Sequence, residues 1–469
     1  MIDTTGHRDP LGLVDALAPP TRRKTIDGTE GAADALVGGL GDPGTVLLSG
    51  PGTGTGPEPL SAHLDRWGPM PETDGVEVLA LLEGSRLDGR GGGGFPLARK
   101  VTAALAAGGA PVLIVNASES EPASAKDAEL CSHRPHLVLD GAALVAAALG
   151  AETVVVHLHR GAERAVAGIV GATAERESCG HDDPTWTVSL GPDRYVAGEA
   201  SAIAGFLHDG DARPRFAMAP LAVVGPSGRP TVVANAETVA HLGVIARLGP
   251  ATWAAFGSPG APGPRLATLV GAVDVPGRVL ELCGPGTVGD LLSAGGCAAP
   301  PAAVLVGGFA GTWVAGDEAW QAPYERPSLA CLGAVPGCGL LGVLPHGACG
   351  LVETARIVEY LAGETAGQCG TCVAGLPRLA AGMGSLAAGT FRPRGLRRLA
   401  TLGDELLGSG ACGHPDGVVR IVRSALDVFG DDVVRHLAGE PCRAADHPPV
   451  IAVPLPYRPV VGGPGRGVA

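Results

Sequence analysis

The chain has 469 residues and a formal net charge of −13 at pH 7. Its length exceeds what one hydrophobic core usually supports, so we expect several domains. The acidic balance, without a basic stripe, argues against binding to nucleic acid and favours a small-molecule or protein partner. The apolar runs at 137–149 and 302–308 are too short to cross a bilayer, and the first residues lack a signal-peptide pattern. We therefore expect a cytoplasmic protein with no direct membrane insertion.

Residues 1–75 are rich in glycine and proline, with one helical pattern near 32–40, and we interpret them as an N-terminal adaptor segment. From residue 76, apolar runs typical of strands alternate with helical patterns. The expected strands are 78–82, 112–115 and 153–156, and the expected helices are a segment ending near 107, 137–149 and 162–174. This alternation predicts a Rossmann-like α/β domain over 76–257, with a mainly parallel sheet covered on both faces.

A different pattern follows the Pro/Gly-rich linker 258–264. Two apolar runs, 266–273 and 278–282, flank Pro276-Gly277 and predict a hairpin, and a helix is expected to open at Thr287. We interpret 264–325 as a small β-grasp domain. Residues 345–440 carry amphipathic helical patterns and predict a bundle, while the tail 441–469 is expected to be extended.

A glycine-rich loop, "LDGRGGGGFPLARK" at 87–100, precedes an expected helix. Glycines allow the backbone to approach a ligand closely, and a helix N-terminus favours an anion such as phosphate. A flexible turn is the alternative in a chain with 75 glycines. Lys100 favours the binding interpretation, because arginine replaces lysine almost everywhere else.

The stretch "GQCGTC" at 367–372 holds two cysteines at a spacing that suits metals and thiol redox chemistry. In a cytoplasmic protein thiols stay reduced, so paired cysteines indicate metal binding or catalysis before disulfides.

The glycine loop resembles the flavin loop of the NADH-binding flavoprotein subunit of respiratory complex I. This family extends to subunits of NAD-reducing hydrogenases and formate dehydrogenases. Three further blocks resemble the family's motifs in the same order: "NASESEP" at 116–122, "YVAGEASA" at 195–202 and "GRPTVVANAET" at 228–238. The resemblance implies a flavin-binding α/β domain, a β-grasp domain of the SLBB-like type and a helical iron–sulfur bundle.

The resemblance also implies the site residues. FMN would be bound by matching positions in the four motifs: Gly89, Arg90, Gly91, Gly92, Gly94, Phe95, Lys100, Asn116, Glu119, Gly198, Glu199 and Asn235. Glu119 and Glu121 would be the catalytic carboxylates, with Glu119 at the flavin ring and Glu121 facing the nicotinamide nucleotide.

Several family contacts to NADH are replaced in this chain. Two aromatic positions are Ala103 and Pro220, and the second glutamate of the third motif is Ala200. Stacking contributes about 0.5–1.5 kcal/mol per ring beyond buried area, and a charge-assisted contact about 1.5–3 kcal/mol. NADH binding should therefore be weakened more than FMN binding.

The family holds its iron–sulfur cluster with C-x-x-C-x-x-C and a fourth cysteine about forty residues further on. Aligned on this pattern, the chain offers Cys369, Cys372 and Cys412, with Ala366 at the first position. Three interpretations remain open: a 4Fe-4S cluster with one site open or differently ligated, a 3Fe-4S cluster, or a vacated site. The candidate replacements are Cys349, Cys338 and His414. Zinc held by three cysteines and one histidine is a further alternative.

The resemblance thus implies a flavin and iron–sulfur electron-transfer subunit that oxidises NADH through FMN and passes single electrons to an iron–sulfur acceptor. Its partner would be a ferredoxin-like subunit or a membrane-bound redox enzyme, to which the chain would be peripheral. Two alternatives are an NADH-independent relay between protein partners and a degenerate structural paralogue without cofactors.

Overall fold

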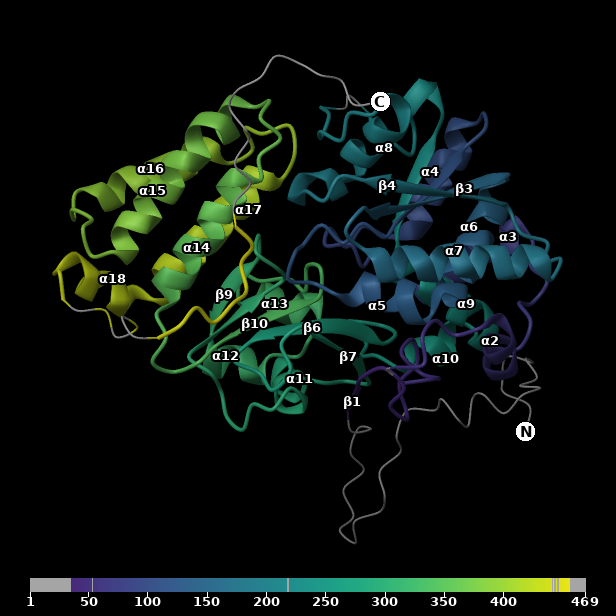
Figure 1. Cartoon of the computed structure of the whole chain (residues 1–469), viewed down its shortest axis with the longest axis horizontal. Coiled ribbons are helices and arrows are strands. Elements are labelled where there is room, and N and C mark those ends of the chain that lie inside the picture. The colour runs from purple at the N-terminus through teal and green to yellow at the C-terminus, as the bar shows by residue number, and fades with distance from the viewer. Residues whose placement is uncertain are drawn as a thin grey trace, which may run out of the picture.

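The computed structural model describes residues 35–52, 54–216, 219–440, 442, 444 and 447–455. The chain forms a parallel-sheet unit, a mixed-sheet unit and a helical bundle that meet near the centre of the molecule (Figure 1). Within the described ranges, no helix is both long and apolar enough to cross a membrane.

The first unit is built on a four-stranded parallel sheet in the order β4-β3-β2-β5. The strands are β2 (Val112–Asn116), β3 (Thr153–His159), β4 (Thr185–Gly191) and β5 (Thr231–Asn235). Helices cover both faces, as the alternating pattern predicts. The helices of this unit are α2 (Leu60–Trp67), α3 (Gly75–Ser85), α4 (Leu97–Ala107), α5 (Lys126–His133), α6 (Pro135–Leu149), α7 (Glu163–Ser178), α8 (Ala200–Asp209), α9 (Ala236–Leu248) and α10 (Pro250–Ala254).

The two faces of the parallel sheet pack differently. Leu113 and Val115 of β2 point into the large core shared with α5, α6, α7 and α9. Ile114, between them, points to the opposite face, where it contacts Ile203 of α8. Side chains alternate along a strand, so β2 is apolar on both faces, as expected for a central parallel strand.

The strand expected at 78–82 is wrong, because these residues belong to α3. Asp74 caps this helix through the backbone N–H groups of Val76 and Glu77, and the Glu77 carboxylate accepts from the Asp74 N–H in return. This reciprocal capping box fixes a helix start. The buried residues Val78 and Leu82 are four apart and therefore share one helix face.

The second unit contains a six-stranded mixed sheet in the order β1-β7-β6-β10-β8-β9. Its strands are β1 (Leu36–Gly38), β6 (Arg265–Gly271), β7 (Arg278–Cys283), β8 (Ala303–Val306), β9 (Thr312–Ala315) and β10 (Leu340–Leu344). The predicted β6–β7 hairpin is confirmed, and the sheet extends beyond 264–325 to β1 and β10. The helical pattern expected at 32–40 is wrong at β1, and residues 32–34 lie outside the described part.

Helices lie on both faces of the mixed sheet. One face packs on the short helices α11 (Val288–Ala294) and α12 (Gly316–Gln321), and α13 (Arg326–Ala330) follows them. Thr287 caps α11 in a capping box with Asp290, which confirms the expected helix start. The opposite face, including Trp313, packs against the bundle.

The predicted C-terminal helices are confirmed as α14 (Gly350–Gly363), α15 (Leu376–Ala387), α16 (Gly395–Leu406), α17 (His414–Val428) and α18 (Gly430–Leu437). The described residues 447–455 run without helix or strand along this bundle, and Ile451 is fully buried between it and the mixed sheet. Most of the tail beyond residue 441 lies outside the described part.

Candidate functional site

A crevice at the carboxyl edge of the parallel sheet is the place where this topology binds ligands. The chain passes from β2 to β3 and β4 on one side, then returns to place β5 on the other side of β2. Such a reversal of strand order creates a crevice at the carboxyl ends of the two flanking strands. Asn116 and Asn235 end β2 and β5 and are direct register partners. Both asparagines therefore lie at the switch point.

The glycine loop between α3 and α4 lies over Asn235. A Cβ added at Gly91 would lie 3.1 Å from the Asn235 Cβ, so the loop backbone approaches that side chain closely. Gly92 adopts φ 97° and Gly94 φ 66°, conformations that favour glycine. At Gly92 and Gly93 a Cβ would meet nothing within 4 Å. The loop thus leaves open space beside the crevice, which fits a bound ligand.

Two basic residues of the glycine motif differ in their placement. Lys100 Nζ donates to the Val233 carbonyl of β5 at 2.8 Å, and burial lowers the pKa of this amine. Arg90 instead extends toward the linker, where its Nη2 donates to the Pro262 carbonyl at 3.3 Å. Its Nε and Nη1 have no partner among the described residues and border a cavity of about 20 Å³, also lined by Arg265 and Tyr324. That volume holds about one water molecule.

Phe95, at the end of the glycine loop, is 51% exposed, whereas most large apolar residues of this unit are buried. Gly89 is held against it, because a Cβ there would lie 2.7 Å from the Phe95 carbonyl oxygen. The structure therefore brings one exposed ring to the rim of the loop. Ala103 and Pro220 stand at the two positions where the family has aromatic residues, and neither provides an exposed aromatic ring.

Glu119 caps α5 with its carboxylate. It accepts from the backbone N–H groups of Asp127 and Ala128 at 3.1 and 2.7 Å and from the Ser124 hydroxyl at 2.6 Å. Burial raises the pKa of Glu119, and the nearby charge of Asp127 raises it further. Its φ of 40° is rare for a residue with a side chain. Strained backbone of this kind clusters at functional sites.

Glu121 is an acid that the structure leaves partly unsatisfied. Its Oε2 accepts from the Phe309 N–H at 2.9 Å and from the Tyr195 hydroxyl at 3.4 Å. Its Oε1 is buried without a partner among the described residues. Burial raises the pKa of Glu121 to about 7, against the opposing effect of the Phe309 hydrogen bond. Near neutral pH this group therefore exchanges a proton readily.

A buried ion network adjoins Asn235 at the end of β5. Lys126 is 1% exposed, and its Nζ lies 2.7 Å from Asp127 Oδ1 and 3.0 Å from Glu237 Oε2. Asn235 Nδ2 donates to Asp127 Oδ2 at 2.6 Å, while Asn116 Nδ2 donates to the Gly198 carbonyl at 3.0 Å. The network thereby fixes both asparagine side chains. Sequence reasoning missed Glu237, although it lies in the fourth motif.

The bundle brings the three predicted cysteine ligands to one end of α14. Cys372 lies in a π-helical turn, Thr371–Gly375, and such turns are frequent at functional sites. Burial, together with the charges of the neighbouring Cys412 and Cys369, raises the pKa of Cys372 to about 11. Burial and Cys369 also raise the pKa of Cys412. The three sulfurs are thus electrostatic neighbours.

The structure distinguishes among the three candidates for the fourth cluster ligand. Cys349 precedes α14, whereas the cluster cysteines adjoin its far end, and a 14-residue helix spans about 21 Å. Cys349 is therefore excluded. Cys338 Sγ donates to the Gly307 carbonyl and lies beside Glu121, outside the bundle.

His414 remains as the third candidate. It opens α17, two residues after Cys412, and is 6% exposed. Its Nε2 donates to the Leu361 carbonyl at 2.8 Å, which fixes the tautomer. Its Nδ1 is buried and has no partner among the described residues. Of the three candidates, His414 alone combines proximity to Cys412 with an unengaged ligand atom.

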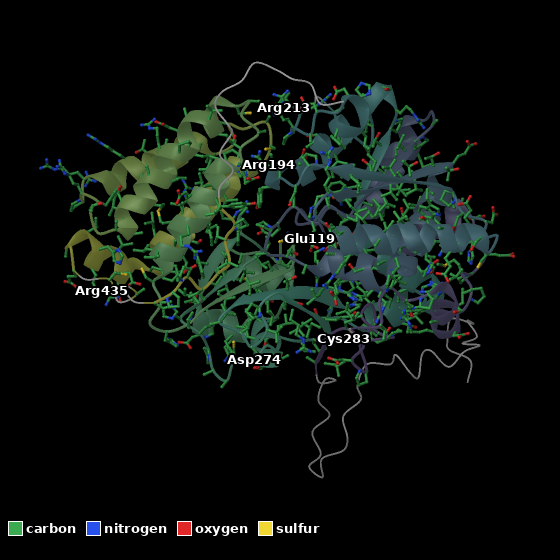
Figure 2. All side chains as sticks on the ribbon, viewed as in Figure 1. Glu119, Arg194, Arg213, Asp274, Cys283 and Arg435 are labelled. Carbon is green, nitrogen blue, oxygen red and sulfur yellow. The ribbon has the colours of Figure 1, made fainter. Side chains whose placement is uncertain are left out.

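The third motif connects the crevice with the cysteine site. Tyr195 packs against His414 with ring centroids 5.5 Å apart, and its backbone N–H donates to Glu364 at the end of α14. Arg194 pairs with the same glutamate at 2.8 Å. Figure 2 shows Arg194 at the boundary with the bundle and Glu119 near the centre of the molecule. At the other end of the motif, Glu199 caps α8 and contributes to raising the pKa of Cys412.

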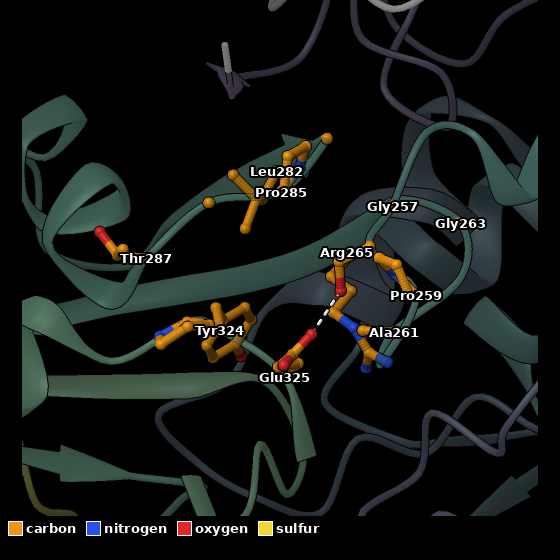
Figure 3. Close-up of a pocket in the computed structure, with 14 residues that line it drawn as sticks. Gly257, Pro259, Ala261, Gly263, Arg265, Leu282, Pro285, Thr287, Tyr324 and Glu325 are labelled. Carbon is orange, nitrogen blue, oxygen red and sulfur yellow. Dashed lines mark hydrogen bonds between the residues drawn. The ribbon is translucent and has the colours of Figure 1, made fainter. Parts of the chain in front are cut away.

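A separate pocket of about 290 Å³ lies between the linker and β7 (Figure 3). Arg265 and Tyr324 line it, and the Ser258 hydroxyl donates to the Glu325 carboxylate at its edge. Neither the glycine loop nor the cluster cysteines border this pocket. It therefore belongs to the mixed-sheet unit and is distinct from the crevice.

Comparisons with known proteins agree with this arrangement. Residues 82–243 match the Nuo51 FMN-binding domain, and residues 353–436 match the NADH-ubiquinone oxidoreductase-F iron-sulfur binding region. The F 2 subunit of NADH-quinone oxidoreductase of Rhizobium meliloti (strain 1021) is 30% identical over 380 residues, covering 78% of this chain and 90% of the relative. The F subunit of the same enzyme of Streptomyces coelicolor (strain ATCC BAA-471 / A3(2) / M145) is 28% identical, covering 78% and 84%.

Among solved structures, a NAD+-reducing [NiFe]-hydrogenase in the H2-reduced state is similar, with a TM-score of 0.71 and 28% identity. The match covers 78% of this chain and 63% of the hydrogenase chain, so the chain spans less than two thirds of that structure.

Proposed function

Because this chain belongs to the family of NADH-quinone oxidoreductase F subunits, we propose that it oxidises NADH through FMN and passes single electrons to an iron–sulfur cluster. When bound, FMN takes up two electrons from a hydride donor and releases them one at a time. The chain's contribution is to hold the two cofactors close together and to exclude water between them.

The residues present fit FMN at the β2–β5 switch point. The open space at Gly92 and Gly93 admits the ligand, while Gly91 and Gly94, which lack side chains, leave room for Asn235 and for the Arg326 guanidinium beside the loop. Asn116 and Asn235 are oriented by hydrogen bonds and line the carboxyl edge. Lys100 uses one of its three donors on Val233, so the other two are available to an anionic group.

The residues present also fit an iron–sulfur cluster at Cys369, Cys372 and Cys412. Cysteine thiolates are the usual cluster ligands, and three lie here as neighbours. We propose His414 Nδ1 as the fourth ligand in place of Ala366, because its tautomer leaves that nitrogen unprotonated. A histidine ligand raises the potential of some clusters relative to an all-cysteine set.

The contact between the third motif and the bundle is the observation that carries the proposal. The motif reaches Asn116 through Gly198, the cysteine site through Glu199, and His414 through Tyr195. One short segment therefore touches both proposed cofactor sites. An electron leaving the flavin site could therefore reach the bundle through this segment.

Cofactor content of the chain purified without air tests the two sites separately. Asn235→Ala should lose FMN and keep iron, whereas Cys372→Ser should lose iron and keep FMN. Cys331→Ser replaces an exposed thiol that belongs to neither proposed site, so it should keep both cofactors and is the matched control. Wild-type chain that stays colourless after incubation with FMN and with iron and sulfide would contradict the proposal.

A second function has a specific observation in its favour. Ala103, Ala200 and Pro220 replace contacts expected for NADH, and none of them offers an aromatic ring or a charge. The same fold would then relay electrons between protein partners through FMN, without binding NADH. A flavin that is reduced by dithionite but not by NADH would distinguish this relay from the main proposal.

The relatives are named as subunits of NADH-quinone oxidoreductase, so partner subunits are expected for this chain as well. We propose a ferredoxin-like redox protein as the acceptor, at the bundle end where Cys369 is partly exposed. Co-purification from the native source, with and without Cys372→Ser, would identify a partner that depends on an intact bundle.

A further inference from the structure

Three potential metal ligands gather at the end of α14 opposite the cluster cysteines. They are Cys349 at the start of α14, His436 in the last turn of α18 and Cys442 in the segment that follows. Their ligand atoms all lie within 4.8 Å of one another, and no other such group occurs in the described part of the chain. Cys349 is 4% and His436 3% exposed, so the group is built into the protein interior.

The spacing of these atoms suits one tetrahedral ion. Zinc binds sulfur at about 2.3 Å and nitrogen at about 2.0–2.1 Å, so in a tetrahedral site those ligand atoms lie about 3.6 Å apart. Cys349 Sγ and His436 Nε2 are 3.7 Å apart. A thiol–imidazole hydrogen bond alone would explain that distance. It would not explain why the Cys442 sulfur lies within reach of both atoms.

His436 is already oriented as a metal ligand. Its Nδ1 lies 2.9 Å from the Leu386 carbonyl oxygen at the end of α15. A carbonyl only accepts, so the proton is on Nδ1 and the Nε2 lone pair points toward Cys349. Histidine ligands of metals are typically fixed by this kind of hydrogen bond on their other nitrogen.

The environment of Cys349 favours a metal thiolate. Its sulfur lies at the N-terminus of α14, for which Cys349 is the N-cap residue. The positive end of the helix stabilises negative charge on sulfur. A cysteine binds a metal ion as the thiolate, so binding of a cation must release a proton.

We propose that Cys349, His436 and Cys442 bind one zinc ion, with the fourth position open to water. Two sulfur ligands and one imidazole are a donor set that suits zinc. The role we infer is an anchor for the C-terminal segment. That segment continues along the bundle, where Glu353 accepts from the N–H groups of Val450 and Ile451. The ion would hold the start of this segment, at Cys442, against the bundle. The Glu353 carboxylate holds the same segment further along, at residues 450 and 451.

Metal analysis of the full chain tests this site. After purification without air from zinc-supplemented cells, mass spectrometry should find about one zinc per chain, separate from any cluster iron. Cys442→Ser should lower the zinc content by about fivefold or more, because a two-ligand site binds zinc far more weakly. Cys331→Ser, the exposed-thiol control, should leave zinc unchanged. Cys442 lies outside the helices, so this variant should fold even if Cys349→Ser does not.

The outcome is separable from the proposed electron-transfer function. Cys372→Ser should lose iron and retain zinc, since its site lies at the other end of α14. The zinc site is refuted if wild-type chain, incubated with zinc chloride and desalted, retains no zinc. It is equally refuted if Cys442→Ser retains as much zinc as wild type. Detection of a Cys349–Cys442 disulfide in the reduced-condition preparation would also overturn the proposal.

Discussion

Replacing Glu121 by glutamine should make the chain more stable at alkaline pH. The wild-type carboxyl is buried, with one oxygen lacking a partner among the described residues and a pKa raised from 4.5 to about 7. Ionising it in place costs free energy that the unfolded chain does not pay. An amide of the same shape carries no charge, so Glu121→Gln removes this cost and retains an acceptor for the Phe309 N–H.

The magnitude follows from the pKa of Glu121. A difference between 4.5 and about 7, at about 1.4 kcal/mol per pH unit, corresponds to about 3 kcal/mol. The folded state binds the proton more tightly than the unfolded state. Wild-type stability therefore falls as pH rises from about 4.5 to about 7 and is constant above that window. Relative to wild type, Glu121→Gln should gain about 2–3 kcal/mol between pH 5 and pH 8.

Urea denaturation at pH 5 and pH 8 gives the free energy of unfolding of the variant and of wild type. The difference between the two proteins measures the gain, because the other titrating groups contribute equally to both. Glu163→Gln, an exposed substitution on α7, is the matched control and should show no such gain. Because the chain has more than one unit, infrared spectroscopy at pH 6 adds a direct readout. The carbonyl band of a protonated carboxyl should be weaker in Glu121→Gln than in wild type.

A stability difference between Glu121→Gln and wild type that does not change with pH would refute this reasoning. It would mean that the Glu121 carboxyl is solvated or paired in solution. An unchanged protonated-carboxyl band in the variant at pH 6 would lead to the same conclusion.

Two further substitutions test the crevice. Lys126→Met should cost about 3–5 kcal/mol in denaturant unfolding, because it leaves the buried carboxylates of Asp127 and Glu237 without their cation. Gly198→Ala should lower FMN affinity by about tenfold or more, which is about 1.4 kcal/mol, measured by fluorescence titration. Its Cβ would overlap the Ser120 hydroxyl oxygen, so the third motif must move.

These two substitutions have clear controls and contrary outcomes. Gly171→Ala, in the middle of α7, adds a Cβ that meets nothing within 4 Å and should leave FMN affinity unchanged. Equal FMN affinity of Gly198→Ala and wild type would show that the motif does not shape the flavin site. A loss below about 1 kcal/mol for Lys126→Met would show that the carboxylates take up protons or water instead.

The periodicity of the sequence was sufficient for β2 and β3, because both are strongly apolar and separated by helices, but it did not predict β4 or β5. It failed at 78–82, where an uninterrupted apolar run fits a strand or a buried helix equally well. The deciding signal was the capping box of Asp74 and Glu77 just before the run. The short strand β1 could not be predicted, because it is defined by pairing with β7, far along the chain.

For the candidate site as well, some features could be predicted from the local sequence and others depend on contacts between distant segments. Resemblance to the family's motifs selected Asn116 and Asn235; the local pattern predicted the strand before Asn116 but not β5, which ends at Asn235. The motifs did not reveal that the Arg90 guanidinium donates to the Pro262 carbonyl of the linker, or that Cys349 is separated from the cluster cysteines by the length of α14. The position of the Arg90 guanidinium depends on how distant segments pack, which spacing along the chain does not encode. The separation of Cys349 follows from the length of α14 alone.

The central claim is that electrons pass from NADH through FMN to a cluster in the bundle. The most direct test is the absorption and electron paramagnetic resonance of wild-type chain, purified and reconstituted without air, on addition of NADH. The account predicts that the flavin absorption bleaches and that a reduced-cluster signal appears, and that Cys372→Ser shows the bleaching without the signal. A bound flavin that stays oxidised with excess NADH, yet is reduced by dithionite, would contradict it.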